Sequence, residues 1–132
     1  MKRIKQEHNT GCGIACVAML SEMTYSKAMQ KARKKFSWES TKRSFYTDSS
    51  QLKELLDELK VNTDRYRLVR NWSSLPDTAI IAINYREKSN NWHWVVFKRE
   101  NDIEYVLDPL SKRDLRKDFS RMRLHGCIPV NI

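Results

Sequence analysis

The sequence predicts an α+β domain in which helices from the first half of the chain pack on an antiparallel β-sheet from the second half. Apolar residues recur with a helical period up to about residue 60, whereas the later segments are short and rich in β-branched and aromatic residues. Helices followed by strands are typical of the α+β class. The 132 residues are enough for one domain, residues 1–132, with a core of its own.

Three helices are expected in the first half. Residues 14–20 are apolar on nearly every side, which predicts a buried helix, although a short buried strand has the same pattern. Thr24 is placed to cap a second helix over residues 25–35. Thr47 or Ser49 is expected to cap a third helix that ends near Lys60, because leucines at positions 52, 55, 56 and 59 form one apolar stripe.

The second half predicts five strands and one helix. The strands are expected at residues 66–69, 78–85, 92–98, 103–107 and 127–132, with a polar turn at 87–91. Proline cannot donate a backbone hydrogen bond to a neighbouring strand, so Pro129 predicts that the last strand lies at an edge of the sheet. A helix is predicted over residues 114–122.

Cys12 is the candidate nucleophile. It lies at the turn that opens the first helix, where free N–H groups and the helix dipole favour the thiolate, which is the reactive form. The flanking Gly11 and Gly13 allow the backbone to come close to a substrate. The alternative for any cysteine is a buried core position, which we expect for Cys16 and Cys127. An odd number of cysteines argues against a disulfide framework, and no second Cys/His pair completes a zinc site.

His93 and Asp108 are the candidate base and its orienting carboxylate. A two-residue turn at Glu100 and Asn101 would place Asp108 directly opposite His93 on the neighbouring strand, with the two side chains about 5 Å apart on one face. A carboxylate in that position holds an imidazole ring in the orientation needed for catalysis. A satisfied core histidine is the alternative for His93 taken alone.

Three other polar residues bear on the site. Gln6 precedes Cys12 by six residues, and its side-chain amide could donate to an oxyanion together with the Cys12 N–H group, or it could be a surface residue. His8 and His125 are competing bases. We rank both below His93, because only Glu7 is available to orient His8 and because His125 lies in an expected turn.

These residues resemble the signature of a known family. Gln6 and the run from Gly11 to Met19, Gly-Cys-Gly-Ile-Ala-Cys-Val-Ala-Met, resemble the bacteriocin-processing, double-glycine cysteine peptidases, which include the N-terminal peptidase domains of bacterial ABC exporters. The run from His93 to Val96 resembles the family's histidine strand, and Asp108-Pro109 its Asp-Pro step. Residues 114–130 resemble its closing helix and strand. Gly11 departs from the family, where a polar residue commonly precedes the nucleophile.

The resemblance implies a papain-like fold and an enzyme that needs no cofactor. It also implies Cys12 as nucleophile, His93 as base, Asp108 as orienting residue and Gln6 in the oxyanion hole. The expected reaction is hydrolysis of an amide bond through a thioester on Cys12. The alternatives are a papain-like deamidase or acyl-transfer effector domain, and a basic binding module with an inert site.

The net charge of +9 is the remaining clue to partners. It favours a peptide or protein substrate of acidic character. Nucleic acid is a less favoured partner, because no nucleic-acid-binding motif accompanies the basic residues. No apolar run approaches the roughly 20 residues of a membrane span. We therefore expect a cytoplasmic protein, with a domain delivered from a larger secreted protein as the alternative.

Overall fold

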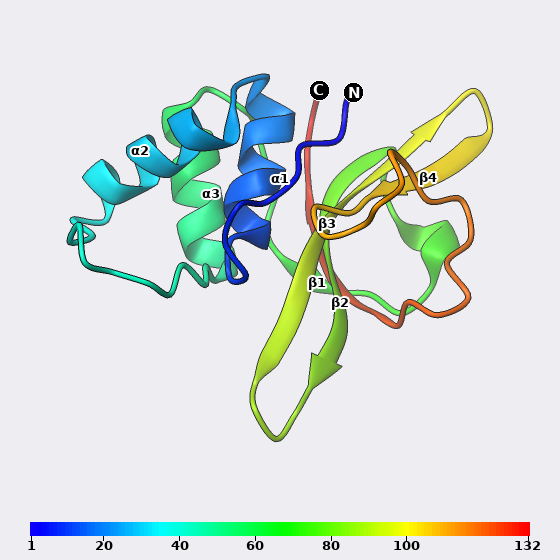
Figure 1. Cartoon of the computed structure of the whole chain (residues 1–132). Coiled ribbons are helices and arrows are strands. Elements are labelled where there is room, and N and C mark those ends of the chain that lie inside the picture. The colour runs from blue at the N-terminus through cyan, green and yellow to red at the C-terminus, as the bar shows by residue number, and fades with distance from the viewer.

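The computed structural model describes residues 1–132 and has three helices on one face of a five-stranded antiparallel sheet (Figure 1). The strand order is β1-β5-β2-β3-β4. The elements are α1 (Cys12–Ser21), α2 (Tyr25–Lys35), α3 (Ser49–Glu58), β1 (Arg67–Leu68), a 3-10 turn η1 (Trp72–Ser74), β2 (Thr78–Arg86), β3 (Asn91–Glu100), β4 (Ile103–Leu107) and β5 (Leu124–Pro129). None of the three helices combines the length and hydrophobicity that a membrane crossing requires.

Helix α1 is the centre of the helical layer and contacts α2, α3 and β3. Every residue from Cys12 to Leu20 is buried, which agrees with its continuous apolar sequence and confirms the predicted buried helix. The α2 bounds and its Thr24 cap are also as predicted, since the Thr24 hydroxyl accepts the Lys27 N–H at 3.1 Å.

The cap of α3 differs from the prediction. Asp48, and neither Thr47 nor Ser49, accepts the Gln51 N–H at 2.8 Å, and the Gln51 side chain accepts the Asp48 N–H at 3.0 Å. This reciprocal pair is a capping box. Thr47 is directed elsewhere: its hydroxyl lies beside Gly13 of α1, and its carbonyl accepts the Trp94 indole N–H at 2.9 Å.

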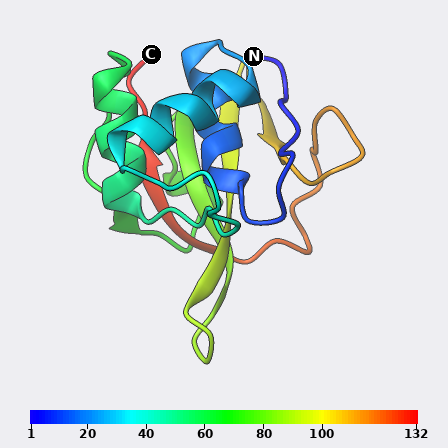
Figure 2. The same ribbon diagram turned by 60° about the vertical axis from the view of Figure 1, so that its left-hand side comes forward.

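The sheet separates two apolar cores. The larger core lies under the helices and includes Trp94 and Val96 of β3. The smaller core lies on the opposite face and includes Val95 and Phe97, as expected from the alternation of side chains along a strand. Figure 2 shows the turned end of the β2–β3 hairpin extending beyond the rest of the molecule.

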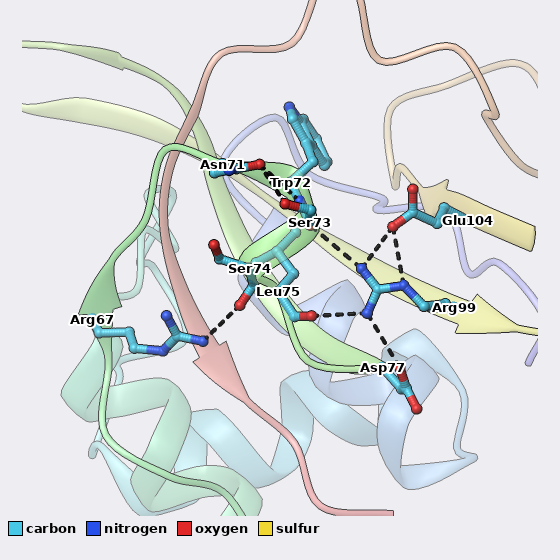
Figure 3. Close-up of polar contacts among 9 residues, drawn as sticks. All are labelled: Arg67, Asn71, Trp72, Ser73, Ser74, Leu75, Asp77, Arg99 and Glu104. Atoms are coloured by element: carbon cyan, nitrogen blue, oxygen red, sulfur yellow. Dashed lines mark hydrogen bonds and ion pairs between the residues drawn. The ribbon is translucent and has the colours of Figure 1, made fainter. Parts of the chain in front are cut away.

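Arg99 holds together the segments that cover the smaller core. The Arg99 guanidinium donates to the carbonyls of Trp72 and Leu75 and pairs with Asp77 and Glu104, at 2.7–3.4 Å (Figure 3). It thereby ties η1 to β3 and β4. The five N–H donors of a guanidinium suit such a set of diverging acceptors.

The predicted helix over residues 114–122 is wrong. The segment is irregular, and Arg116 forms an isolated bridge with Val106 of β4 through two hydrogen bonds of 2.8 Å. The Ser111 and Asp118 side chains accept backbone N–H groups two residues further on. Such local bonds compete with helix formation.

The prediction that the last strand lies at a sheet edge is also wrong, because β5 lies between β1 and β2. The Pro129 carbonyl accepts the Asp64 N–H, whereas Val130 donates to Thr78 of β2. The carbonyl and nitrogen of one strand residue face the same neighbour, so the missing N–H of Pro129 faces away from β2. The neighbouring chain on that side lies before β1, which begins only at Arg67.

The β3–β4 turn is displaced from its predicted position. Asn101 and Asp102, both with positive φ, form the turn, and Arg99 pairs with Glu104. Asn and Asp tolerate this backbone conformation and favour such two-residue turns. The predicted pairing of His93 directly opposite Asp108 is therefore wrong. The turn moves by one residue, so the pairing between the strands shifts by two residues, which leaves each side chain on its predicted face.

Candidate active site

The sulfur of Cys12 lies at the edge of the sheet. Cys12 is the first residue of α1 and its side chain is almost buried, with 7% exposed. The Trp94 N–H of β3 points at Sγ, with a nitrogen–sulfur distance of 3.5 Å. Strand β4 ends at Leu107, opposite Val96, so no strand residue competes for this N–H. The edge of β3 therefore directs a hydrogen-bond donor at the thiol.

The start of α1 provides further donors. Gly11 makes no side-chain cap, and the first N–H groups of a helix have no acceptor within the helix. A Cβ atom on Gly13 would lie 2.1 Å from the Thr47 hydroxyl oxygen, so only glycine fits there. The backbone N–H groups beside Cys12 are thus free to bind a developing negative charge.

His93 and Asp108 are in direct contact. The Nε2 atom of His93 lies 2.7 Å from Oδ1 of Asp108, and both side chains are mostly buried. The same carboxylate oxygen accepts the Leu110 N–H at 2.9 Å, which fixes its position. Because Nε2 of His93 is hydrogen-bonded to Asp108, Nδ1 is the ring nitrogen that is available to the Cys12 thiol. The two residues are thus in contact, although their strand register differs from the predicted one.

The charges at the site favour a protonated ring. Burial alone would lower the pKa of His93, but the Asp108 carboxylate and the Cys12 sulfur outweigh it and raise the pKa to about 9. Burial would likewise raise the pKa of Asp108, but its contact with His93 and the Leu110 N–H bring it below the usual range. The ring therefore lies between a carboxylate and the sulfur, and both neighbours favour its protonated form.

Gln6 is buried in the loop that leads to Cys12. Its backbone N–H donates to the Pro109 carbonyl at 3.2 Å, directly after Asp108. Its side-chain Nε2 donates to the carbonyls of His8 and Asn9 at 2.7 and 3.0 Å, while Oε1 is buried without a partner. The surface alternative for Gln6 is excluded by its 6% exposure. In this conformation both N–H groups of the Gln6 side-chain amide donate to backbone carbonyls of the loop.

The structure accounts for Gly11, the departure from the family signature. A Cβ atom there would lie 2.0 Å from the Tyr25 hydroxyl oxygen. That hydroxyl is held by a 2.9 Å hydrogen bond to Nδ1 of His8. Burial and the charges of Glu7 and Cys12 raise the pKa of Tyr25 to about 12. A polar side chain at position 11 has no room in this arrangement.

The remaining histidines and cysteines have other environments. His8 packs against Tyr25 and Phe45, and His125 stacks on Tyr85 at 4.3 Å. Cys16 and Cys127 are fully buried, as predicted for core positions. Burial, with the neighbouring Cys12 and Asp108 charges, raises the pKa of Cys16 well above that of an ordinary thiol. Burial also raises the pKa of Cys127, against the opposing effect of Arg67.

Sequence reasoning missed a hollow beside Cys12. Its volume is about 260 Å³, and it lies between the start of α3 and the β2–β3 hairpin. It is lined by Cys12, Tyr46, Thr47, Asp48, Gln51, Asn90, Asn91, Trp92 and Trp94. Most of these residues lie in loops or at element ends, where no periodic pattern indicates which of them meet. The Trp92-Trp94 pair was the one available signal.

A thiol at a helix start, an imidazole and a carboxylate in contact with it are groups that can carry out nucleophilic acyl transfer. No group of three or more His, Cys, Asp or Glu side chains is arranged to hold a metal ion.

A search of curated proteins finds no match to the chain. Residues 1–123 match the family model described as the Peptidase C39 family, the bacteriocin-processing cysteine peptidases. The architecture agrees with the papain-like fold expected of that family. The chain therefore belongs to the Peptidase C39 family of cysteine peptidases.

Proposed function

We propose that this member of the family hydrolyses an amide bond of a peptide or protein through a thioester on Cys12. The observation that carries the proposal is the 2.7 Å bond from His93 to Asp108, in a ring whose raised pKa reflects the neighbouring Asp108 and Cys12. This arrangement supplies a nucleophile, a proton donor and a group that orients the donor.

The reaction begins when the Cys12 thiolate attacks the carbonyl carbon of the substrate. The carbon–sulfur bond forms, and the negative charge moves to the carbonyl oxygen. The carbon–nitrogen bond then breaks while His93 gives its proton to the leaving amine, which leaves a thioester on Cys12. Water, activated by the neutral ring, attacks the thioester. The carbon–sulfur bond breaks, the acid product leaves, and His93 is again protonated beside the thiolate.

Gln6 is proposed as the second oxyanion donor, beside the Cys12 N–H. The proposal is supported by its burial in the loop that leads to Cys12 and by the backbone bond that holds it next to Asp108-Pro109. Its Nε2 group now donates to the His8 and Asn9 carbonyls. Donation to a substrate oxygen requires the amide to exchange one of these acceptors for the oxyanion.

An acidic segment in the substrate is a further part of the proposal. Basic side chains line a hollow of about 390 Å³ in the loop that follows Asp108; they are Lys112, Arg113, Arg116 and Arg121. None of the four forms an ion pair within the chain, and Asp118 is the single acidic residue among them. Exposed, unpaired positive charge attracts acidic partners at low ionic strength. This loop directly follows Asp108, which supports such an attraction close to the proposed reaction site.

A peptide library of known sequences tests the proposal. We expect new chain ends, detected by mass spectrometry, with the wild type. Cys12→Ala and His93→Ala should lose roughly a thousandfold or more in rate. The matched variants Cys127→Ala and His125→Ala should retain turnover, because these residues lie outside the proposed site. Turnover by Cys12→Ala close to that of the wild type would exclude the thioester.

The same experiment separates the alternative chemistries. A papain-like deamidase would give a mass gain of about one dalton on a Gln or Asn side chain without a chain break. A binding module with an inert site would give neither product. The role of the basic loop is tested by comparing peptides with and without an acidic flank at low and high salt. A rate advantage of the acidic peptide that disappears with salt is expected.

A further inference from the structure

A separate pocket lies beside the smaller core, on the face of the sheet opposite the helices. Its volume is about 350 Å³. Arg70, Trp72, Tyr85, Arg123 and His125 line it, together with two apolar residues of the smaller core. The pocket shares no residue with the hollow beside the nucleophile or with the basic loop at residues 111–121. Small-molecule sites in proteins have volumes of roughly 300–1,000 Å³, so the space is sufficient for a small ligand.

Aromatic rings form the walls of this pocket. Tyr85 and His125 are stacked, with ring centroids 4.3 Å apart and 15° between the ring planes. Trp72 is stacked in the same way on Phe119, at 4.5 Å and 19°. The Trp72 carbonyl accepts from Arg99, whereas its indole ring points away from that guanidinium (Figure 3). The three rings that line the pocket are half-buried, so each has an accessible part on which a further flat ring can pack.

The pocket carries positive charge that the chain does not neutralise. Arg70 and Arg123 are exposed and form no ion pair, and no acidic residue lines the pocket. Arginines with a structural role in the same region differ from these two. The Arg67 guanidinium donates to the Ser74 carbonyl, and the Arg99 guanidinium pairs with two carboxylates. The charges of Arg70 and Arg123 are therefore available to a ligand.

Aromatic walls and unpaired guanidinium groups together suit a flat ring that carries an anionic group. Nucleobases stack on aromatic side chains whatever their identity, because every base has a π-face. Guanidinium groups bind phosphate oxygens through two parallel hydrogen bonds. An inorganic anion would leave the aromatic walls uncovered, and an uncharged ring would leave the two guanidinium groups unpaired.

We propose that this pocket binds a nucleotide unit, with the base stacked on the aromatic walls and the phosphate held by Arg70 and Arg123. A free nucleotide and a single-stranded nucleic acid both offer this unit. The inference goes beyond the proposed hydrolysis of a peptide and uses none of its residues. It therefore stands or fails independently of Cys12.

The first measurement is calorimetric titration of the protein with AMP, adenosine and inorganic phosphate at low salt. We expect AMP to bind about tenfold more tightly than either of the other two, because only AMP offers both the ring and the charge. Added salt should reduce the advantage of AMP over adenosine. Equal affinity of AMP and adenosine, equal affinity of AMP and phosphate, or no binding of AMP up to about 10 mM would overturn the inference.

Substitutions separate the two parts of the pocket. Arg70→Gln and Arg123→Gln should each weaken AMP binding severalfold and leave adenosine binding unchanged, whereas Tyr85→Leu should weaken both. Lys31→Gln is the control, since Lys31 is an exposed, unpaired residue of α2 in the helical layer and the variant removes the same charge. If Lys31→Gln weakens AMP binding as much as the arginine variants do, the attraction is general and the inference fails.

NMR spectra of the labelled protein locate the ligand. AMP should shift the Trp72 indole N–H signal and the backbone amide signal of His125, and should leave the Trp38 indole signal unchanged. Shifts confined to the helical layer would contradict the proposed site. An adenine octanucleotide identifies the source of the ligand: much tighter binding than AMP indicates a nucleic-acid strand, and affinity equal to that of AMP indicates a free nucleotide.

Discussion

The Asp108 carboxylate reaches His93 along a diagonal of the sheet, with 2.7 Å between Oδ1 and Nε2. The last paired residues of β3 and β4 are Val96 and Leu107, so Asp108 is one residue beyond the ladder. Diagonal neighbours on one face lie within reach of long side chains. Because Asp108 stands just outside the strand, its carboxylate also accepts the Leu110 N–H, which orients it toward the ring.

The first prediction concerns the protonation of His93. In Asp108→Asn the neutral amide no longer stabilises the imidazolium, so the pKa of His93 should fall from about 9 toward its ordinary value of 6.5. If the protonated ring is needed for turnover, the alkaline limit of kcat/KM should move to lower pH by a similar amount. An NMR titration of the His93 ring measures the pKa directly. An unchanged titration in the variant would contradict the role of Asp108.

The same contact makes stability depend on pH. The folded pKa of His93 lies above the unfolded value, so the folded state binds the proton more tightly. Its contribution is fully present below about pH 6.5 and is lost as the pH rises through about 9. Urea unfolding at pH 6 and at pH 9.5 should show this loss in the wild type. Asp108→Asn should show a smaller difference between the two pH values.

The second prediction concerns cysteine reactivity. In the folded protein iodoacetamide should label Cys12 and spare Cys16 and Cys127, because burial raises the pKa of both and excludes the reagent. His93→Ala should slow the labelling of Cys12. Peptide mapping by mass spectrometry identifies the modified residue, and the unfolded protein, in which all three must react, is the control. Preferential labelling of Cys16 or Cys127 would contradict the structure.

The third prediction concerns the fit of Gly11 against Tyr25. Gly11→Ala places a methyl group 2.0 Å from the Tyr25 hydroxyl oxygen and should destabilise the protein by about 1–3 kcal/mol. Tyr25→Phe removes that oxygen and should recover part of the loss, so the double variant should be more stable than the sum of the single changes predicts. Denaturant unfolding of all four proteins measures the coupling. Strict additivity would show that the hydroxyl is not the obstacle.

The fourth prediction concerns Arg99. Its guanidinium satisfies two carbonyls and two carboxylates around η1 (Figure 3). Arg99→Met should therefore lower the free energy of unfolding by about 1–3 kcal/mol. Arg86→Met is the control, since Arg86 is exposed and forms no ion pair, and should change stability by less than about 0.5 kcal/mol. Equal effects of the two substitutions would show that the Arg99 contacts contribute little.

Local signals were sufficient for the three helices of the first half and for the choice of Cys12, His93 and Asp108 as candidate residues. The α2 bounds followed from its Thr24 cap, because a cap and an apolar stripe are properties of neighbouring residues. Cys12, His93 and Asp108 each lie in a short motif, and the structure brings His93 and Asp108 into contact. The cap of α3 was misassigned among adjacent polar residues, because Thr47 is committed to contacts with Gly13 and Trp94 that are distant in sequence.

Long-range pairing explains the other errors. The position of β5 depends on which side of Pro129 faces β2, and the segment at 114–122 is held open by a bridge to β4. Neither of these two long-range contacts produces a periodic pattern in the sequence. The turn at Asn101 and Asp102 is different, since two residues that tolerate positive φ stand together. Weighing that preference would have given the correct register.

The early end of β4 also affects the tendency of the protein to self-associate. An open strand edge invites pairing with another chain and is a common origin of aggregation. Here the outer edge of β4 is bridged by Arg116, and at Trp94 the edge of β3 is met by the Cys12 sulfur. The proposed nucleophile and the loop that follows Asp108 thus shield this side of the sheet. Removing the sulfur, as in Cys12→Ala, leaves the Trp94 N–H without an acceptor at this edge. We therefore expect this variant to aggregate more readily than the wild type.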